Sequence, residues 1–253
     1  TWQEHAPATI DDVRVVQSVA TPADVTALQK GELPSHLQAL GSFALDEKAG
    51  SARVSGGTTA GSVATVTGEG ATLGAAGKIG NALQLDGSTA YAATAGPVVD
   101  TTKSFTVSAW VKLNNKDNNY TFLSQAGDHA SGFQLYYSKY YDKWTFNRHA
   151  TDTDDTKIVR AMSKDTAKAG VWTHLTGVYN SNTKKIELFI NGKPQEATAF
   201  TTPWRTQGGL QIGRLFYKST WQEHAAAAID NVRVWDRAVG ADELVNDGIR
   251  VKN

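Results

Sequence analysis

The sequence of 253 residues contains no cysteine, one methionine and six prolines. Without cysteine it has no disulfide bonds, thiol nucleophiles or cysteine-ligated zinc sites. It also has no excess of charge of either sign, because 25 Lys and Arg residues balance 25 Asp and Glu residues. Interspersed, balanced charge argues against nucleic acid as a partner. The apolar runs are much shorter than the ~20 residues of a membrane-spanning helix, so we expect no insertion into a membrane.

Apolar and polar side chains alternate along much of the chain. The alternation is regular in residues 105–111 and 186–190, which is typical of strands whose two faces differ. Asn191-Gly192 favours a tight hairpin turn, because both residues tolerate positive φ. Further strands are expected at 82–85, 120–125, 133–137, 143–147, 172–179, 210–212 and 229–235. Residues 50–80, rich in Gly, Thr and Ala, are interpreted as an irregular excursion. About a dozen short strands predict an all-β fold, a two-sheet antiparallel β-sandwich of the jelly-roll type.

An internal repeat sets the expected domain boundaries. Residues 1–15 read TWQEHAPATIDDVRV and residues 220–234 read TWQEHAAAAIDNVRV, so the two copies differ at three positions. Each copy is followed by a segment that resembles an N-capped short helix. The simplest interpretation is a tandem array, with residues 1–34 as the last strand and tail of a preceding module, 35–40 as a linker and 41–253 as a complete module. The alternative is an N-terminal extension that merely resembles the last strand.

Five motifs follow one another in an order that carries a family resemblance. They are GKIGNALQLDG at 77–87, SFTVSAWVKL at 104–113, WTHL at 172–175, IELFINGK at 186–193 and IDNVRVWDR at 229–237. Together they resemble the laminin-G-like, or concanavalin A-like, jelly-roll domains of bacterial secreted proteins, which are related to pentraxins. The resemblance implies a concanavalin A-like sandwich and an extracellular or cell-surface location. It leaves function open, because this fold serves lectins, glucanases, pentraxins and plain spacers.

The motifs expected of an enzyme are missing from the sequence. Glucanases of this fold carry alternating glutamate and aspartate on one strand, and no E-x-D-x-x-E or E-x-D-x-E run occurs here. Asp152, Asp154 and Asp155 alternate with threonine rather than with apolar residues, so they are interpreted as a solvated loop. The nucleophile elbow, the HExxH zinc motif and the phosphate loop are also missing. We therefore expect a protein that is not an enzyme.

The resemblance implies calcium as a candidate cofactor, because calcium is common in this family and takes several oxygen ligands from loops. Aligned with the pentraxin pattern, Asp128 falls at an early ligand position and Glu223 near a late one. The central acidic run of pentraxins falls near residues 214–216, which offer no carboxylate. A single ion between Asp128, Glu223 and backbone carbonyls is one candidate site.

A second candidate calcium site pairs Asp86 with Asp230, because the strands that carry them are neighbours in this fold. The alternative is that Asp86 caps a turn before Gly87 while Asp230 hydrogen-bonds to backbone.

Aromatic residues crowd one predicted hairpin and suggest a sugar-binding surface. Alternation places Phe133, Leu135 and Tyr137 inward and Tyr136 outward. The candidate ligand-binding residues are Tyr136, Tyr140, Tyr141, Trp144, Arg148 and Trp221. Exposed rings could stack on sugar faces while neighbouring polar groups bind hydroxyls. The alternative is that these rings serve only packing or contacts between modules.

The leading functional prediction is a non-catalytic extracellular binding or adhesion module of a tandem array, with a glycan or a surface protein as ligand and adjacent repeat modules as partners. One alternative is a structural spacer or assembly module, and another is an accessory domain of a carbohydrate-active enzyme. The repeated strand at 10–16 has an unpaired edge in this chain, so we expect it to dock on a sheet edge or to mediate self-association.

Overall fold

The computed structural model describes residues 22, 25–26, 40–56 and 63–240. The chain divides into two compact units, Thr1–Gln38 and Ala39–Asn253. The repeated strand at 10–16 and nearly all of the segments 1–34 and 35–40 lie outside the described residues. Their assignment to a preceding module, a linker and a self-association element stays a prediction. No helix among the described residues is long and apolar enough to cross a bilayer.

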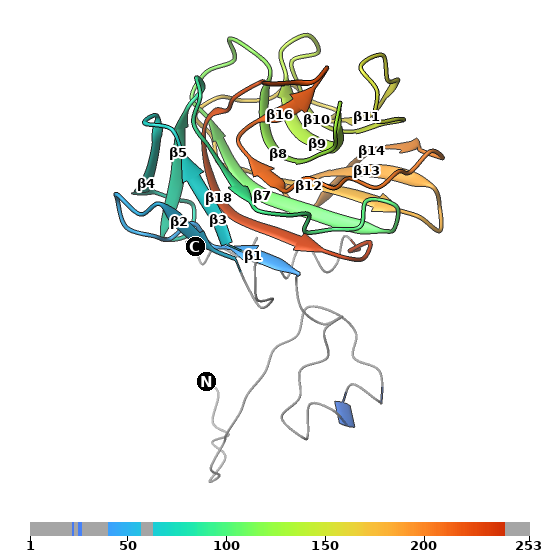
Figure 1. The fold of residues 1–253 in the computed structure, drawn as a ribbon, viewed down its shortest axis with the longest axis horizontal. Helices are drawn as coiled ribbons and strands as arrows, with labels where there is room; N and C mark the ends of the chain where they lie inside the picture. Colours follow the sequence, from blue (N-terminus) through green and yellow to red (C-terminus); the bar gives the residue numbers. More distant parts are fainter. Residues whose placement is uncertain (1–21, 23–24, 27–39, 57–62, 241–253) are drawn as a thin grey trace, which may run out of the picture. The chain divides into compact units, whose positions relative to one another are not determined.

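The second unit is built from two antiparallel sheets of eight strands each and a small hairpin (Figure 1). The first sheet has the order β14 (Lys193–Ala199), β13 (Lys185–Ile190), β12 (Thr173–Asn180), β7 (Phe105–Leu113), β18 (Ala226–Trp235), β5 (Asn81–Asp86) and β4 (Ala71–Ala76), and β1 (Gly41–Phe43) also pairs with β18.

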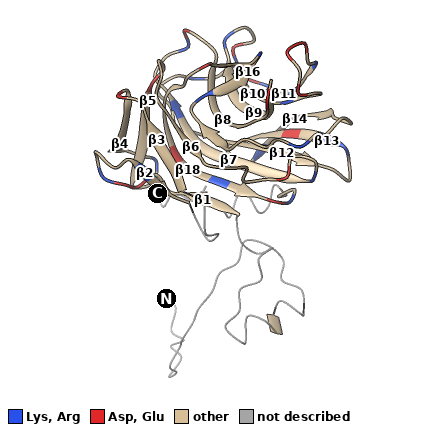
Figure 2. Ribbon diagram, viewed as in Figure 1, with Lys and Arg blue, Asp and Glu red and all other residues tan. Residues whose placement is uncertain are grey.

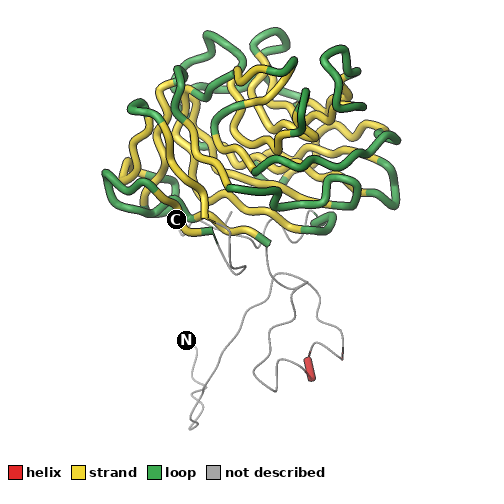
Figure 3. Tube along the Cα trace, in the orientation of Figure 1, coloured by secondary structure: helices red, strands yellow, loops and turns green. Residues whose placement is uncertain are grey.

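The second sheet has the order β11 (Ile158–Met162), β10 (Lys143–His149), β9 (Ser131–Ser138), β8 (Tyr120–Ala126), β15 (Leu210–Ile212), β6 (Tyr91–Thr94), β3 (Val63–Thr67) and β2 (Arg53–Ser55). The hairpin consists of β16 (Leu215–Tyr217) and β17 (Thr220–Gln222). Strands dominate the described part of this unit and loops join them (Figure 3). The prediction of an all-β, two-sheet sandwich is confirmed.

Alternation along the strands generates the core between the sheets. The inward side chains of β7, namely Phe105, Val107, Ala109 and Val111, belong to one hydrophobic cluster with Phe133, Leu135 and Tyr137 of β9. Phe105 and Phe133 touch across the sandwich with ring centroids 5.1 Å apart. The predicted inward positions of β9 are therefore confirmed.

Turn chemistry also follows the sequence. Asn191 and Gly192 join β13 to β14 with φ values of 50° and 74°. Two consecutive positive φ angles twist a two-residue hairpin in the sense that the flanking strands require. The predicted Asn-Gly hairpin is confirmed.

The region at 50–80 differs from the irregular excursion expected from its composition. It contains β2 and β3 on the second sheet and β4 on the first. Few of its side chains are buried, since most of those in β3 and β4 are exposed or half-buried. Hydrogen bonding to neighbouring strands, rather than a strong apolar pattern, holds such strands in place, and composition does not register that contribution.

Candidate functional site

A hollow of about 180 Å³ opens on the outer face of the second sheet, and we call it the sheet-face pocket. Its lining comes from β9 (Gln134, Tyr136, Ser138), β10 (Asn147, His149), β11 (Ile158, Arg160), β16 (Leu215, Tyr217) and loops (Asn119, Tyr140, Tyr141, Glu223). The register explains this grouping, because Asn147 lies opposite Gln134 on one side and opposite Arg160 on the other. Side chains directly opposite one another share a face of the sheet.

Glu223 supplies the only carboxylate among the residues that line the sheet-face pocket. It lies in the turn between β17 and β18 with a φ of 53°, and its carbonyl oxygen accepts a hydrogen bond from Thr121 N at 2.9 Å. Its carboxylate accepts hydrogen bonds from Asn119 Nδ2 at 2.9 Å, Thr121 Oγ1 at 3.1 Å and Gln134 Nε2 at 2.5 Å. Burial raises the pKa of Glu223, and the three donors act in the opposite direction.

Two other residues that line the sheet-face pocket are almost wholly buried and keep a free acceptor atom. Asn147, which is 1% exposed, donates through Nδ2 to Gln134 Oε1 at 2.9 Å, and its Oδ1 has no hydrogen-bond partner among the described residues. His149, also 1% exposed, contacts Ser131 O through Nδ1 at 2.6 Å. Because a carbonyl only accepts, Nδ1 carries the proton. Burial lowers the pKa of His149 to about 4, so the ring is neutral at pH 7 and the unpartnered Nε2 is an acceptor.

Aromatic side chains form the walls of the sheet-face pocket. The Tyr217 ring stacks on His149 with centroids 5.0 Å apart and an interplanar angle of 6°. The Tyr136 hydroxyl accepts a hydrogen bond from Arg160 Nε at 3.4 Å. Tyr140 is 87% exposed and meets Tyr141 edge-on at 4.8 Å. Flat rings beside buried acceptors suit a ligand with both apolar faces and hydroxyl groups.

Of the sequence-predicted ligand residues, the structure brings Tyr136, Tyr140 and Tyr141 together in this pocket. Trp144 packs against the core instead, with its ring 5.8 Å from Phe122, because it shares the inward phase of β10, and it also lines the second hollow described below. Trp221, 40% exposed, lies outside the lining of the sheet-face pocket.

The prediction that Arg148 binds a ligand is wrong. It is fully buried, and its guanidinium carbon lies 4.7 Å and 4.6 Å from the ring centroids of Tyr179 and Phe200. It donates through Nη2 to Thr101 O at 2.8 Å, and burial lowers its pKa to about 9. A side chain enclosed in this way packs the core and does not reach a ligand on the sheet face.

The carboxylate pairs proposed for calcium do not come together. Asp86 lies opposite Ala226 in the ladder between β5 and β18, so Asp230 is four residues, or about 13 Å, farther along β18. Asp86 accepts hydrogen bonds from Ser88 N and Oγ at 2.9 and 2.6 Å, which lowers its pKa. Asp230 Oδ2 accepts two backbone N–H bonds of 2.8 Å from residues 78 and 79. Asp86 therefore caps a turn and Asp230 binds backbone N–H groups, as the alternative interpretation expects.

Asp128 and Glu223 are also separated. Glu223 contacts Thr121 near the start of β8, whereas Asp128 follows the end of β8 and donates its backbone N–H to Asp152 Oδ2 at 2.8 Å. Asp152 Oδ1 accepts two more backbone N–H bonds of 2.8 Å, from residues 129 and 130, so this carboxylate organises the β8–β9 turn rather than standing free in a solvated loop. Among the described residues, no group of three or more His, Asp or Glu side chains could hold a metal ion.

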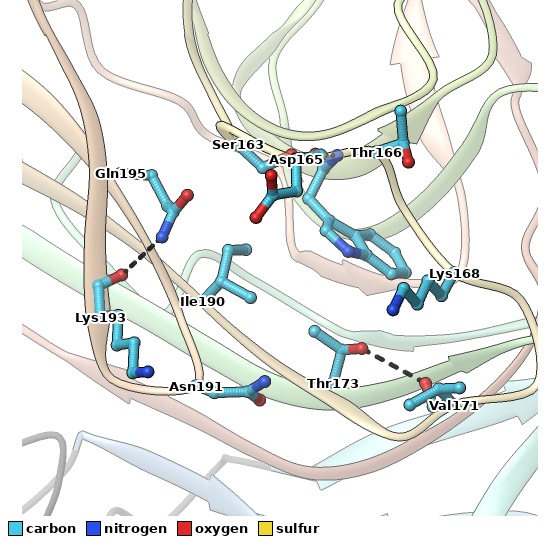
Figure 4. A pocket seen from close by; sticks show the side chains of 11 residues that line it. Ser163, Asp165, Thr166, Lys168, Val171, Thr173, Ile190, Asn191, Lys193 and Gln195 are labelled. Carbon is cyan, nitrogen blue, oxygen red and sulfur yellow. Dashed lines mark hydrogen bonds between the residues drawn. The ribbon is translucent and has the colours of Figure 1, made fainter.

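A second hollow, of about 370 Å³, lies between the β13–β14 hairpin and the segment that follows β11 (Figure 4). Lys168, Val171 and Ile190 are among the residues that line it. Several of its polar side chains bond to nearby backbone, as in the bond from Thr173 Oγ1 to Val171 O at 3.3 Å. None of its lining residues has a buried polar atom without a partner in the described part of the chain, so the sheet-face pocket is the stronger candidate.

Several residues of the sheet-face pocket escaped prediction from sequence. Asn119, Gln134, His149, Arg160 and Tyr217 were not singled out as ligand residues. For Gln134 a signal existed, because it shares the outward phase of β9 with Tyr136. For the others the grouping depends on strand pairing across the sheet, which alternation within one strand does not specify.

Comparison with known proteins identifies solved structures that have a similar fold. Domain 4 of AbnA, an extracellular GH43 arabinanase from Geobacillus stearothermophilus solved with arabinotriose, matches with a TM-score of 0.68 and 17% identity over 83% of this chain and 98% of that chain. Trypanosoma rangeli sialidase in complex with sialic acid matches with a TM-score of 0.56 and 14% identity over 83% of this chain, which spans only 33% of the sialidase. The CBM40 domain of Ruminococcus gnavus IT-sialidase, bound to α2,3-sialyllactose, matches with a TM-score of 0.51 and 14% identity over 65% of this chain and 94% of that chain.

A search of the curated proteins found no significant match. The family model described as the concanavalin A-like lectin/glucanases superfamily (Laminin_G_3) matches residues 86–245, which include the β7–β18 core and the whole sheet-face pocket. The resemblance seen in the sequence motifs is therefore confirmed, and the chain belongs to the concanavalin A-like lectin/glucanases superfamily.

Proposed function

We propose that this domain is a non-catalytic glycan-binding module and that the glycan occupies the sheet-face pocket. One observation carries the proposal: Asn147 and His149 line an open hollow, and each has a buried acceptor atom, Asn147 Oδ1 and His149 Nε2, that lacks a partner among the described residues. A buried polar atom without a partner costs free energy of about 1–3 kcal/mol, so such atoms are expected where a ligand or ordered water completes the hydrogen bonding. Sugar hydroxyls are suitable donors.

The relatives support the same function. Two of them are domains solved with arabinotriose and with α2,3-sialyllactose. They come from an arabinanase and a sialidase, so these similarities favour an accessory domain of an extracellular carbohydrate-active enzyme over a free-standing adhesion module. With identities of 17% and 14%, these domains share the fold of this chain, and the assignment of a glycan as ligand rests on the sheet-face pocket.

Binding fits the sheet-face pocket better than hydrolysis does. Glycoside hydrolysis by the common mechanism needs two carboxyl groups about 5–10 Å apart. Glu223 is the only Asp or Glu among the residues that line the pocket. A pocket with one carboxylate can orient a sugar but lacks the second group that would complete an acid–base or acid–nucleophile pair.

The first experiment is a glycan array followed by isothermal titration calorimetry with the best neutral and sialylated hits. Tyr140→Ala and Asn147→Ala should each weaken binding at least fivefold, and circular dichroism should show that both variants are folded. Trp221→Ala is the matched control: it removes a half-exposed ring outside the pocket and should leave Kd unchanged. The titration is repeated in millimolar calcium and in chelator, since a calcium-assisted site would lose binding in chelator.

An array without any hit would overturn the proposal and favour the spacer alternative. If glycans bind but neither Tyr140→Ala nor Asn147→Ala weakens their binding, the glycan site lies outside the sheet-face pocket. The hollow beside Lys168 and Ile190 is then the next candidate.

A further inference from the structure

Three residues that line the sheet-face pocket, Asn147, His149 and Glu223, carry hydrogen-bond acceptors. Asn147 Oδ1 and His149 Nε2 are free acceptors, since the donor groups of both side chains are already engaged. Glu223 receives three donors from neighbouring side chains, while a carboxylate has about four acceptor positions. Such acceptors bind a ligand through its hydrogen-bond donors, and in a glycan the hydroxyl groups are donors.

The charges of the pocket narrow the class of glycan that it can bind. The Glu223 carboxylate is enclosed by neutral donors, Asn119, Thr121 and Gln134, so no cation neutralises it through direct contact within this set. Arg160 is the one cationic residue that lines the pocket, and its charge acts to lower the pKa of Glu223. The two side chains form no ion pair, and Arg160 donates instead to the Tyr136 hydroxyl at 3.4 Å and to Ile158 O at 3.5 Å. A ligand carboxylate would therefore meet a buried like charge, and like charges brought together in a desolvated site repel strongly.

On these grounds, and resting on the proposed function, we infer that the pocket selects uncharged, hydroxyl-rich sugars and rejects anionic ones, with Glu223 as the specificity-determining residue. Glu223 accepts a sugar hydroxyl and excludes a uronate or sialate carboxylate from the same place.

The ligand extends beyond one ring. A hollow of about 180 Å³ is smaller than the 300–1,000 Å³ typical of sites for drug-sized ligands, so it accommodates a single sugar ring. A shallower depression, lined by Asn118, Asn119, Lys139 and Tyr140, shares Asn119 and Tyr140 with the pocket. Asn119 Oδ1 accepts a hydrogen bond from Lys139 N at 2.9 Å, which fixes the boundary between the two hollows. The next sugar of a neutral oligosaccharide lies over this boundary, against Tyr140.

The test compares probes that differ only at one carbon. Neutral disaccharides and trisaccharides of galactose and glucose are titrated beside their galacturonate and glucuronate counterparts, and oligosaccharides of arabinose and xylose complete the neutral set. The wild-type domain should bind at least one neutral oligosaccharide and bind the matched uronate at least tenfold more weakly. Glu223→Gln keeps the shape of the side chain and should reduce this ratio to below threefold.

Asp165→Asn is the control, because it removes an exposed carboxylate from the other hollow and should keep the ratio of the wild type. Affinity should also rise from the monosaccharide to the disaccharide, and Tyr140→Ala should remove that rise. If Glu223→Gln does not fold, the wild-type ratio alone decides. Equal or tighter binding of the uronates, or a ratio unchanged in Glu223→Gln, overturns the specificity inference while glycan binding stands. If no probe of either charge binds, the proposed function itself is overturned.

Discussion

Gly177 offers a sharp test of how the two sheets are packed. It lies in β12 of the first sheet, directly beneath the Phe146 ring of β10 in the second sheet. A Cβ atom at position 177 would lie 2.6 Å from Cε2 and Cγ of Phe146 and closer still to Cδ2. Ordinary contacts between carbon atoms are 3.5–4.0 Å. The ring would have to move by about 1 Å, the difference between these distances.

Phe146 has little room for such a movement. It is fully buried, and its centroid lies 6.3 Å from those of both Phe105 and Phe133. Overpacking in a filled core typically costs about 1–3 kcal/mol, and we expect Gly177→Ala to lie near 3 kcal/mol because the ring is enclosed on both sides. For a domain of this size that loss lowers Tm by roughly 6–12 °C.

The assay is urea and thermal unfolding followed by circular dichroism. Gly96→Ala is the matched control, because an added Cβ there meets nothing within 4 Å and should change stability by less than about 0.5 kcal/mol. Phe146→Leu removes part of the obstructing ring, so combined with Gly177→Ala it should recover about 1–2 kcal/mol relative to the sum of the single variants. A Gly177→Ala protein as stable as wild type, or strictly additive variants, would refute the packing described here.

Three further predictions concern single side chains. Burial raises the pKa of Asp230 to about 6 from 3.8, so the folded state binds a proton more tightly than the unfolded state. The resulting stabilisation is present below the unfolded pKa and is lost as pH rises through the folded pKa, so between about pH 4 and pH 6 wild type should lose roughly 2 kcal/mol relative to Asp230→Asn in urea unfolding, and parallel pH profiles would refute this. Asp152→Ala removes the acceptor of three backbone N–H groups at the β8–β9 turn, so amide exchange at residues 128–130 should accelerate while exchange in the core strands stays unchanged. Tyr137→Phe removes a 3.0 Å hydrogen bond to the Asp142 carboxylate and should cost about 1–2 kcal/mol in urea unfolding, and an unchanged midpoint would show that this bond contributes nothing.

Local patterns determined which face of a strand enters the core. The alternation of β9 placed Phe133, Leu135 and Tyr137 inward and Tyr136 outward, and the structure has them so. The Asn191-Gly192 hairpin was equally local. Both features were predictable because a side-chain period of two and a left-handed turn are properties of neighbouring residues.

In β10, residue type and strand alternation point in opposite directions. As a polar residue beside the aromatic hairpin, Arg148 is predicted to bind a ligand, yet it shares the inward phase of Trp144 and Phe146. Residue type argued against burial, since arginine is almost never fully buried unless it is paired. Stacking against the Tyr179 and Phe200 rings and a carbonyl acceptor made the burial tolerable, and these partners are remote in sequence.

What only the tertiary structure decided is which polar groups meet. Fold class, the family motifs and the aromatic hairpin could be read along the chain. The separation of Asp86 from Asp230 required the register of β5 against β18, and the sheet-face pocket required Glu223 to reach Gln134 and Asn119, which lie 89 and 104 positions away in sequence. A hydrogen bond depends on atoms within about 3 Å of one another, whatever their separation along the chain, so the identity of a binding site is settled by packing.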